Sequence, residues 1–242
     1  MRYFRIQSSI NEKHMGKIPQ VKEVIYNGDV EAHNFVDRVY YTKVDFEPVV
    51  ANPVLHPKAI LTDLIAPFGM GSTFTVLISG KLKLILEQYR DDGMQFFQCS
   101  VFQNGIEYND FWLLNMYIAN NEYINYSGSE IILWKKKKEE PGKVPEIINI
   151  SDIDNFNERI EEARTNREIL HVKKISLKKD IKEDFFILRY IEGGAGYFVS
   201  EKLKKEMEDA GCTGIEFQSS ELSYHEWVKR DGPRDEVYGR SW

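Results

Sequence analysis

Apolar and polar positions follow the same order in two parts of the chain, at a constant offset of 121 residues (200 − 79). Residues 77–83 and 198–204 each contain an apolar pair followed by a serine, one variable residue and then Lys-Leu-Lys. Each serine, Ser79 or Ser200, can cap a helix by accepting a hydrogen bond from a free backbone N–H of the first turn. The alignment continues without a gap to residues 97 and 218, so the pattern predicts a duplicated structural unit.

Helical spacing of apolar residues follows each serine and predicts one buried face per helix. These residues are Leu82, Ile85, Leu86 and Tyr89 in the first copy, and Leu203, Met207 and Ala210 in the second. A glycine, Gly93 or Gly214, then favours a turn, and β-prone residues follow at 94–97 and 215–218. Each unit is therefore predicted as strand, serine-capped helix, glycine turn and strand.

The clearest hairpin signal lies after the first copy, where residues 95–103 and 106–116 flank Asn104-Gly105. Asn-Gly supplies the positive φ angles of a type I′ turn. No similar hairpin follows the second copy. Glycine-rich residues 193–196 predict another hairpin turn rather than a phosphate-binding loop, since an apolar run separates them from the next helix. Further strands are predicted at 36–46, 74–78, 172–177 and 185–190, and a helix from Ser151 or Asp152 with Ile153, Phe156, Ile160 and Ala163 on one face.

These elements predict an α+β protein with two related lobes, each containing the strand–helix–strand unit and antiparallel hairpins. The basic run 135–138 is followed at once by two glutamates and Pro-Gly, which is typical of a solvated linker. We therefore expect an N-terminal lobe at 1–134, a charged linker at 135–146 and a C-terminal lobe at 147–242.

Composition narrows the class of protein. The chain has 242 residues, of which 42% are hydrophobic, enough to bury a core without disulfides. Its net charge of −6 disfavours nucleic acid as a partner, and no stretch approaches the roughly 20 apolar residues of a membrane helix. Two cysteines and five scattered histidines show no metal-ligand spacing, so we expect no cofactor and no metal, and a cytoplasmic location.

One stretch stands out by its charge. Between Arg90 and Lys135 there is no lysine or arginine, whereas six acidic and ten aromatic residues lie there. Aromatic residues are enriched at interface hot spots, and carboxylates steer basic partners, although aromatics in a hairpin also build ordinary cores. The alternative docking face is the charged tail, 227–242. We expect the partner to contact Asp91, Asp92, Glu107, Tyr108, Asp110, Glu122 and Tyr123.

The second copy, residues 197–204 and 214–217, resembles the C-terminal signature of immunity family eleven of bacterial polymorphic toxin systems. The first copy resembles it too, together with the aromatic strand 111–115 and residues 126–130, so the resemblance spans roughly residues 60 to 218. Gly80 departs from the glutamate of the second copy. This family brings no catalytic residues to carry over.

The resemblance implies a cytoplasmic immunity protein that binds a cognate protein toxin and occludes its active site without catalysis. The acidic stretch favours a basic toxin. Two other classes stay open: a hydrolase or transferase whose site is assembled from scattered residues, and a non-enzymatic adaptor. The sequence leaves the oligomeric state open.

Overall fold

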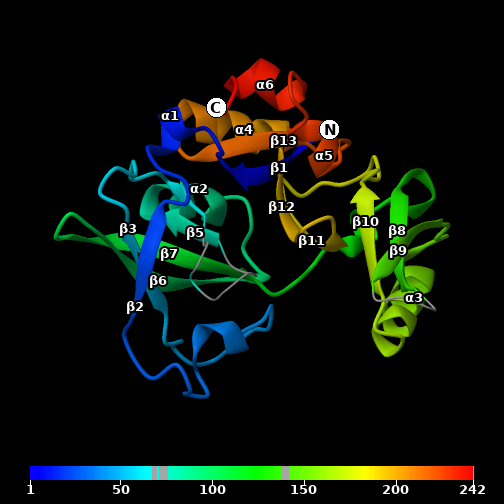
Figure 1. Ribbon diagram of the computed structural model, residues 1–242, viewed down its shortest axis with the longest axis horizontal. Helices are drawn as coiled ribbons and strands as arrows, with labels where there is room; N and C mark the ends of the chain where they lie inside the picture. The colour runs from blue at the N-terminus through cyan, green and yellow to red at the C-terminus, as the bar shows by residue number, and fades with distance from the viewer. Residues whose placement is uncertain (67–69, 71–75, 138–141, 242) are drawn as a thin grey trace.

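The computed structural model describes residues 1–66, 70, 76–137 and 142–241. It contains helices and two sheets, which confirms the predicted α+β class (Figure 1). Seven strands form one sheet in the order β13 (Ile215–Ser219), β1 (Tyr3–Ser8), β12 (Gly194–Ser200), β11 (Phe185–Ile191), β10 (Ile169–Lys174), β8 (Glu130–Lys136) and β9 (Lys143–Ile148). Six form the other in the order β2 (Val21–Tyr26), β3 (Ala51–Leu55), β6 (Met94–Gln103), β7 (Ile106–Met116), β5 (Val76–Ser79) and β4 (Leu64–Ile65).

The helices lie outside these sheets. They are α1 (Glu12–Met15), α2 (Gly80–Glu87), α3 (Ile153–Thr165), α4 (Glu201–Asp209), α5 (Tyr224–Trp227) and α6 (Pro233–Tyr238), with short 3-10 helices η1 (Val36–Arg38), η2 (Asn121–Tyr123) and η3 (Tyr126–Gly128). α3 packs on the seven-stranded sheet near β10, while α2 and α4 lie between the two sheets (Figure 1).

The duplicated unit is confirmed, and it begins one strand earlier than the sequence indicates. Ser79 and Ser200 cap α2 and α4 by accepting hydrogen bonds from backbone N–H groups at 3.2 and 3.1 Å. Each serine hydroxyl also donates to an aspartate, Asp63 in the first unit and Asp184 in the second. These aspartates are again 121 residues apart (184 − 63) and directly precede β4 and β11. Each unit is therefore aspartate, strand, strand, serine-capped helix and strand.

The missing strand of the second unit comes from the start of the chain. In the first unit β7 lies antiparallel between β5 and β6, and in the second β1 lies antiparallel between β12 and β13. Phe111 pairs with the capping serine of the first unit and Tyr3 with that of the second. At the other end, Met116 pairs with the first residue of β6 and Ser8 with the first residue of β13. β1 is thus the register equivalent of β7.

The two units bury their helices together. One core cluster contains Leu82, Ile85 and Leu86 of α2 with Leu203 and Met207 of α4. At its edge, the Tyr89 hydroxyl after α2 donates to Glu206 of α4. The predicted apolar faces therefore lie at the contact between the units, except that Ala210 follows the end of α4 and is exposed.

The segment between β2 and β3 is a loop with one short 3-10 helix, not the predicted strand. The strand expected at 36–46 is wrong: residues 36–38 form η1, and no strand follows before β3. Tyr40 and Tyr41 have φ angles of 31° and 59°, which a strand cannot contain. The β-branched residues that suggested the strand, Val36 and Val39, are fully buried in the core of the six-stranded sheet. They anchor a loop instead.

The remaining element predictions are largely confirmed. The 95–103/106–116 hairpin, the helix after Asp152 and the strand from Phe185 are present. The hairpin predicted at 193–196 is present too, but its turn lies at residues 192 and 193, and residues 194–196 already belong to β12. β10 begins and ends three residues earlier than the predicted 172–177, because Ser176 exchanges hydrogen bonds with Asn125 and Ser129 instead. Of the predicted strand 74–78, residues 74 and 75 lie outside the described residues and β5 starts at Val76.

The boundary between the two sheets does not coincide with the boundary expected between the two lobes. Whether the lobes fold as separate units stays a prediction. The described part of the charged segment, residues 135–137 and 142–146, belongs largely to two paired strands, since β8 and β9 pair from Ile131 with Ile148 to Lys136 with Lys143. Both strands belong to the sheet of the second unit, as does β1. The two predicted lobes therefore share the seven-stranded sheet, to which 1–134 contributes β1 and most of β8, whereas the six-stranded sheet lies entirely within 1–134.

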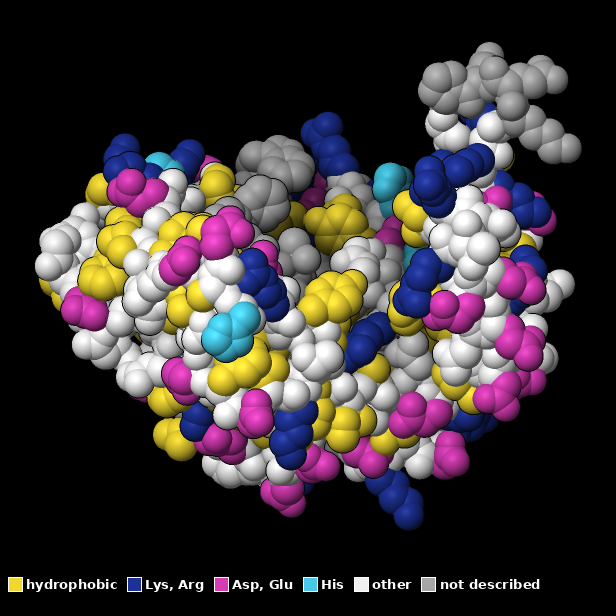
Figure 2. All heavy atoms as spheres, turned by 90° about the horizontal axis from the view of Figure 1, so that it is seen from below, with side chains coloured by type: hydrophobic (Ala, Val, Ile, Leu, Met, Phe, Trp, Pro, Cys, Tyr) yellow, Lys and Arg dark blue, Asp and Glu magenta, His cyan; other side chains and the backbone are white. Residues whose placement is uncertain are grey.

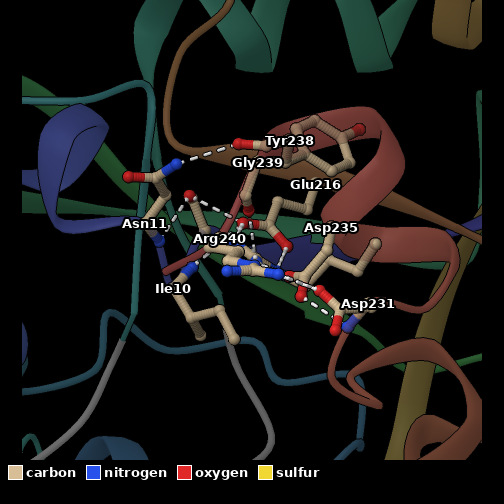
Figure 3. Close-up of polar contacts among 10 residues, drawn as sticks. Ile10, Asn11, Glu216, Asp231, Asp235, Tyr238, Gly239 and Arg240 are labelled. Carbon is tan, nitrogen blue, oxygen red and sulfur yellow. Dashed lines mark hydrogen bonds and ion pairs between the residues drawn. The ribbon is translucent and has the colours of Figure 1, made fainter. Parts of the chain in front are cut away.

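A buried ion pair fixes the C-terminal segment to this sheet (Figure 3). Arg234 of α6 and Glu216 of β13 are 1% and 2% exposed, and two guanidinium nitrogens donate to the carboxylate at 2.7 Å. The same carboxylate accepts from the Ser9 hydroxyl at 2.8 Å and from the Ile10 N–H at 3.1 Å. The pair thus joins the two ends of the described chain. Nearby, the Tyr238 hydroxyl accepts from the backbone N–H of β13 residue 217, which covers the edge of the sheet.

The two capping serines should differ in their contribution to stability. We expect Ser200→Ala to lower the free energy of unfolding by about 2 kcal/mol and Ser79→Ala by about 1 kcal/mol. Ser200 is fully buried, so no water can replace either of its hydrogen bonds, whereas Ser79 is half-buried. Urea unfolding monitored by fluorescence measures both, with the exposed Ser127→Ala as the control. Equal losses for the two caps would contradict the assignment.

Replacing one partner of the buried ion pair should lower the free energy of unfolding more than replacing both partners. Arg234→Met leaves the Glu216 carboxylate buried without a counter-charge, and we expect a loss of about 3 kcal/mol. Replacing both partners, with Arg234→Met and Glu216→Leu, should recover part of that loss. Chemical denaturation of the single and double variants provides the comparison, and a double variant less stable than the single one would argue against it.

Candidate functional site

The seven predicted partner-binding residues fall into two groups at opposite ends of the β6–β7 hairpin. Asp91 and Asp92 precede β6 at its open end, and Glu122 and Tyr123 of η2 follow β7 at the same end. Glu107, Tyr108 and Asp110 lie toward the Asn104-Gly105 turn. About eight strand residues separate the ends, or roughly 25 Å. The structure therefore does not bring the seven residues together in one site.

The first group surrounds Arg90. Its guanidinium donates to backbone carbonyls of Asp92, Ile118 and Phe185 at 2.7–3.2 Å, and to the Asn120 side chain at 2.9 Å. Burial lowers the pKa of Arg90, while Tyr123, Glu183, Asp92 and Glu122 act in the opposite direction. We call Asp91, Asp92, Glu122, Tyr123 and Glu183 the Arg90 group.

The acids of this group differ in their surroundings. Asp91, Asp92 and Glu122 are exposed. The Tyr117 hydroxyl donates to Asp92 at 2.7 Å and thereby lowers the pKa of that carboxyl. Burial and a hydrogen bond to Glu183 raise the pKa of the Tyr123 phenol. The four carboxylates of the group outnumber its one arginine, and Lys178 and Lys182 lie beside Glu122, Tyr123 and Glu183.

The second group is partly committed to the fold. Glu107 is exposed and accepts from the Ser100 hydroxyl at 2.9 Å, while Tyr108 packs against the core of the six-stranded sheet. Asp110 lies over the start of α2: a Cβ atom at Gly80 would come within 1.9 Å of its carboxylate. That crowding explains why the first unit has glycine where the second has Glu201, whose backbone N–H donates to the Arg2 carbonyl at 3.0 Å.

Residues 91–134 contain no lysine or arginine, but lysines from other parts of the chain lie close to them. The Lys83 ammonium lies 4.8 Å from the Trp112 ring centre, and Lys43 lies 5.6 Å from that of Tyr117. Lys173 pairs with Glu130 at 2.8 Å. The negative charge of residues 91–134 is therefore partly balanced in space, and this includes Asp92, whose pKa Lys43 and Arg90 help to lower.

A cleft opens where the seven-stranded sheet parts between β10 and β11. These strands share one parallel bridge, Val172 with Ile191, and then diverge. Tyr190, with a φ of 55°, lies next to this bridge and at a register shift between β11 and β12. The cleft has a volume of about 380 Å³, and Figure 2 shows the hollowed face between the two halves of the molecule.

Aromatic, aliphatic and basic side chains line this cleft. The loop after η1 contributes Tyr40 and Tyr41, and the diverging strands contribute Ile169, Leu170, His171, Arg189, Tyr190 and Ile191, with residues 193–195 at the hairpin turn. Burial lowers the pKa of the His171 imidazole. Hydrophobic and basic side chains are both visible around the hollow in Figure 2.

Arg189 of β11 forms a wall of the cleft and joins the seven-stranded sheet to the loop after η1 and to the end of β7. Its Nη2 donates to the backbone carbonyls of Tyr41, Met116 and Tyr117 at 3.2–3.3 Å, and its guanidinium carbon lies 4.1 Å from the Tyr41 ring centre. Burial lowers the pKa of Arg189. The Asn121 side chain accepts from the Arg189 N–H and donates to its carbonyl, at 2.8 and 3.1 Å. This covers the edge of β11 that β10 has left.

Sequence reasoning missed the cleft. Tyr41 and Arg189 are 148 residues apart, and no spacing rule relates them. The feature that marks the cleft is the positive φ angles of Tyr40, Tyr41 and Tyr190, and the sequence contains no signal for these angles. The described residues contain no cluster of three or more histidine, cysteine, aspartate or glutamate side chains that could hold a metal ion. Within that same part of the chain, no helix is long and apolar enough to cross a membrane.

Comparison with known proteins gives one result. A family model described as "Immunity protein family (Imm11)" matches residues 41–221. No curated protein matches the chain. The matched range includes both capped helices, the acidic hairpin and all residues that line the cleft, except Tyr40. It leaves out β1, which completes the second unit, and the segment that holds α5 and α6.

Proposed function

Because the chain belongs to the Imm11 immunity protein family, we propose that it neutralises a cognate toxin by binding the toxin domain and covering its active site. The family match over residues 41–221 is the observation that carries this proposal. Inhibition by occlusion needs a tight, stoichiometric complex and no turnover. We place this complex in the cytoplasm, with a protein as the partner rather than a nucleic acid or a membrane.

We propose the Arg90 group as the surface that attracts the toxin. Its carboxylates at Asp91, Asp92 and Glu122 are exposed, and the one arginine among them is committed to backbone carbonyls. Such a group accelerates encounter with a basic partner. Glu107 and Tyr108 at the far end of the hairpin are a second contact, whereas Asp110 is held over α2. A basic toxin domain fits this arrangement.

The direct test uses the toxin domain encoded by the neighbouring gene. Co-expression should restore growth, and the two chains should elute together from size-exclusion chromatography in a 1:1 ratio. An enzyme that inactivates the toxin would instead protect at ratios far below 1:1. A host adaptor would bind without restoring growth, and absence of both complex and protection would overturn the proposal.

Charge reversal tests the surface. We expect Asp92→Lys with Glu122→Lys to slow association by about tenfold at low salt, because steering by the Arg90 group becomes repulsion. Added salt should then speed association of the variant, whereas it slows that of the wild type. Stopped-flow fluorescence measures both rates.

The matched control makes the same change of net charge on the exposed side of α3, with Asp154→Lys and Glu158→Lys. It should associate at nearly the wild-type rate. If the α3 variant slows association as much as the Arg90-group variant, the effect comes from overall charge and this surface is not the docking site.

A further inference from the structure

We propose that the cleft between β10 and β11 receives an acidic side chain of the toxin, carried on a short projecting segment with apolar neighbours. This inference rests on the proposed function and adds to it the chemistry of one contact. It concerns a surface separate from the Arg90 group, across the connection from β7 to η2 that Arg90 and Arg189 both hold.

The side chains that line the cleft favour binding of an anionic group over a cationic one. Its ionisable lining groups, apart from tyrosines, are His171 and Arg189, and none of the described residues that line it is aspartate or glutamate. The chain as a whole has net charge −6, so a cleft without carboxylates departs from the average surface. A carboxylate entering it meets donors in the lining, and the acid that acts on His171, Glu192, lies outside that lining.

Arg189 carries the argument furthest. It is half-buried, and no described carboxylate forms an ion pair with it, whereas the fully buried Arg234 has Glu216. Its hydrogen bonds go to neutral carbonyls, and its Nε is buried without a partner among the described residues. A cation partly removed from water without a counter-charge is unfavourable. A carboxylate from the partner would supply that counter-charge.

The shape of the cleft fits a protein segment. Six non-glycine residues of the described chain have positive φ angles, and three of them, Tyr40, Tyr41 and Tyr190, lie in its lining. Strained backbone that is retained at a concave surface points to a binding role. Tyr40 is 67% exposed, Ile169 is 51% exposed and Tyr190 is 38% exposed. These side chains give apolar contacts on either side of the basic wall, as in the aromatic anchors of protein interfaces.

Ile169 allows a test that separates charge from shape. It lies in the lining, is half-exposed and has no hydrogen bond to lose from its side chain, so Ile169→Asp and Ile169→Lys should both fold. Ile25, which is 49% exposed on the edge strand β2, is the matched control, with the same two substitutions. Calorimetric titration with the catalytically inactivated toxin domain at low and high salt gives the dissociation constants, and circular dichroism checks folding.

We expect Ile169→Asp to weaken binding by about tenfold or more, most strongly at low salt, and Ile169→Lys to bind as well as the wild type or better. Both Ile25 variants should bind like the wild type. Equal weakening by aspartate and lysine would show a contact without charge preference and overturn the proposal, as would wild-type affinity for both. If the wild-type chain itself forms no complex, the proposed function fails; if only the Ile169 pattern fails, the inference fails alone.

Discussion

The rest of the structure depends on the mutual burial of two helices. α2 and α4 each have one apolar face, and both faces lie in one core cluster with strand residues of the two sheets. Burial in this shared cluster removes Leu82, Leu86, Leu203 and Met207 from water, at about 2 kcal/mol for each side chain. That sum is comparable to the net stability of a typical domain. The contact also sets the two sheets beside each other, and the cleft and the acidic hairpin take their positions from it.

Local chemistry made much of this fold predictable. The serine caps, the Asn-Gly turn and the helical faces depend on residues within a few positions of one another, and all are present. The predicted strand at 36–46 fails because the buried valines there face the core from a loop, in which Tyr40 and Tyr41 adopt positive φ angles. Hydrophobic pattern reports burial, and here it does not report backbone conformation.

The two proposed binding surfaces were less predictable, since the position of each depends on pairing between distant strands. Acidic residues that are close in sequence lie at opposite ends of a long hairpin, so composition grouped what the fold separates. The cleft is assembled from a loop near residue 40 and strands near residue 190. The role of β1 was equally hidden, because it matches β7 at a different offset from that of the repeat and only the strand register reveals the relation. The exchange of Gly80 and Asp110 for Glu201 and Arg2 shows how the two units have diverged around one shared plan.

The position of β1 has a consequence for how the protein is made. β1 leaves the ribosome before every other strand, but its two neighbours, β12 and β13, are synthesised after all the rest. The first unit has its strands in one continuous stretch and can close during translation, whereas the second must wait with an open gap in its sheet. The second sheet is therefore completed only when translation has passed β13, so a partly made chain holds the β6–β7 hairpin but not the strands that enclose β1.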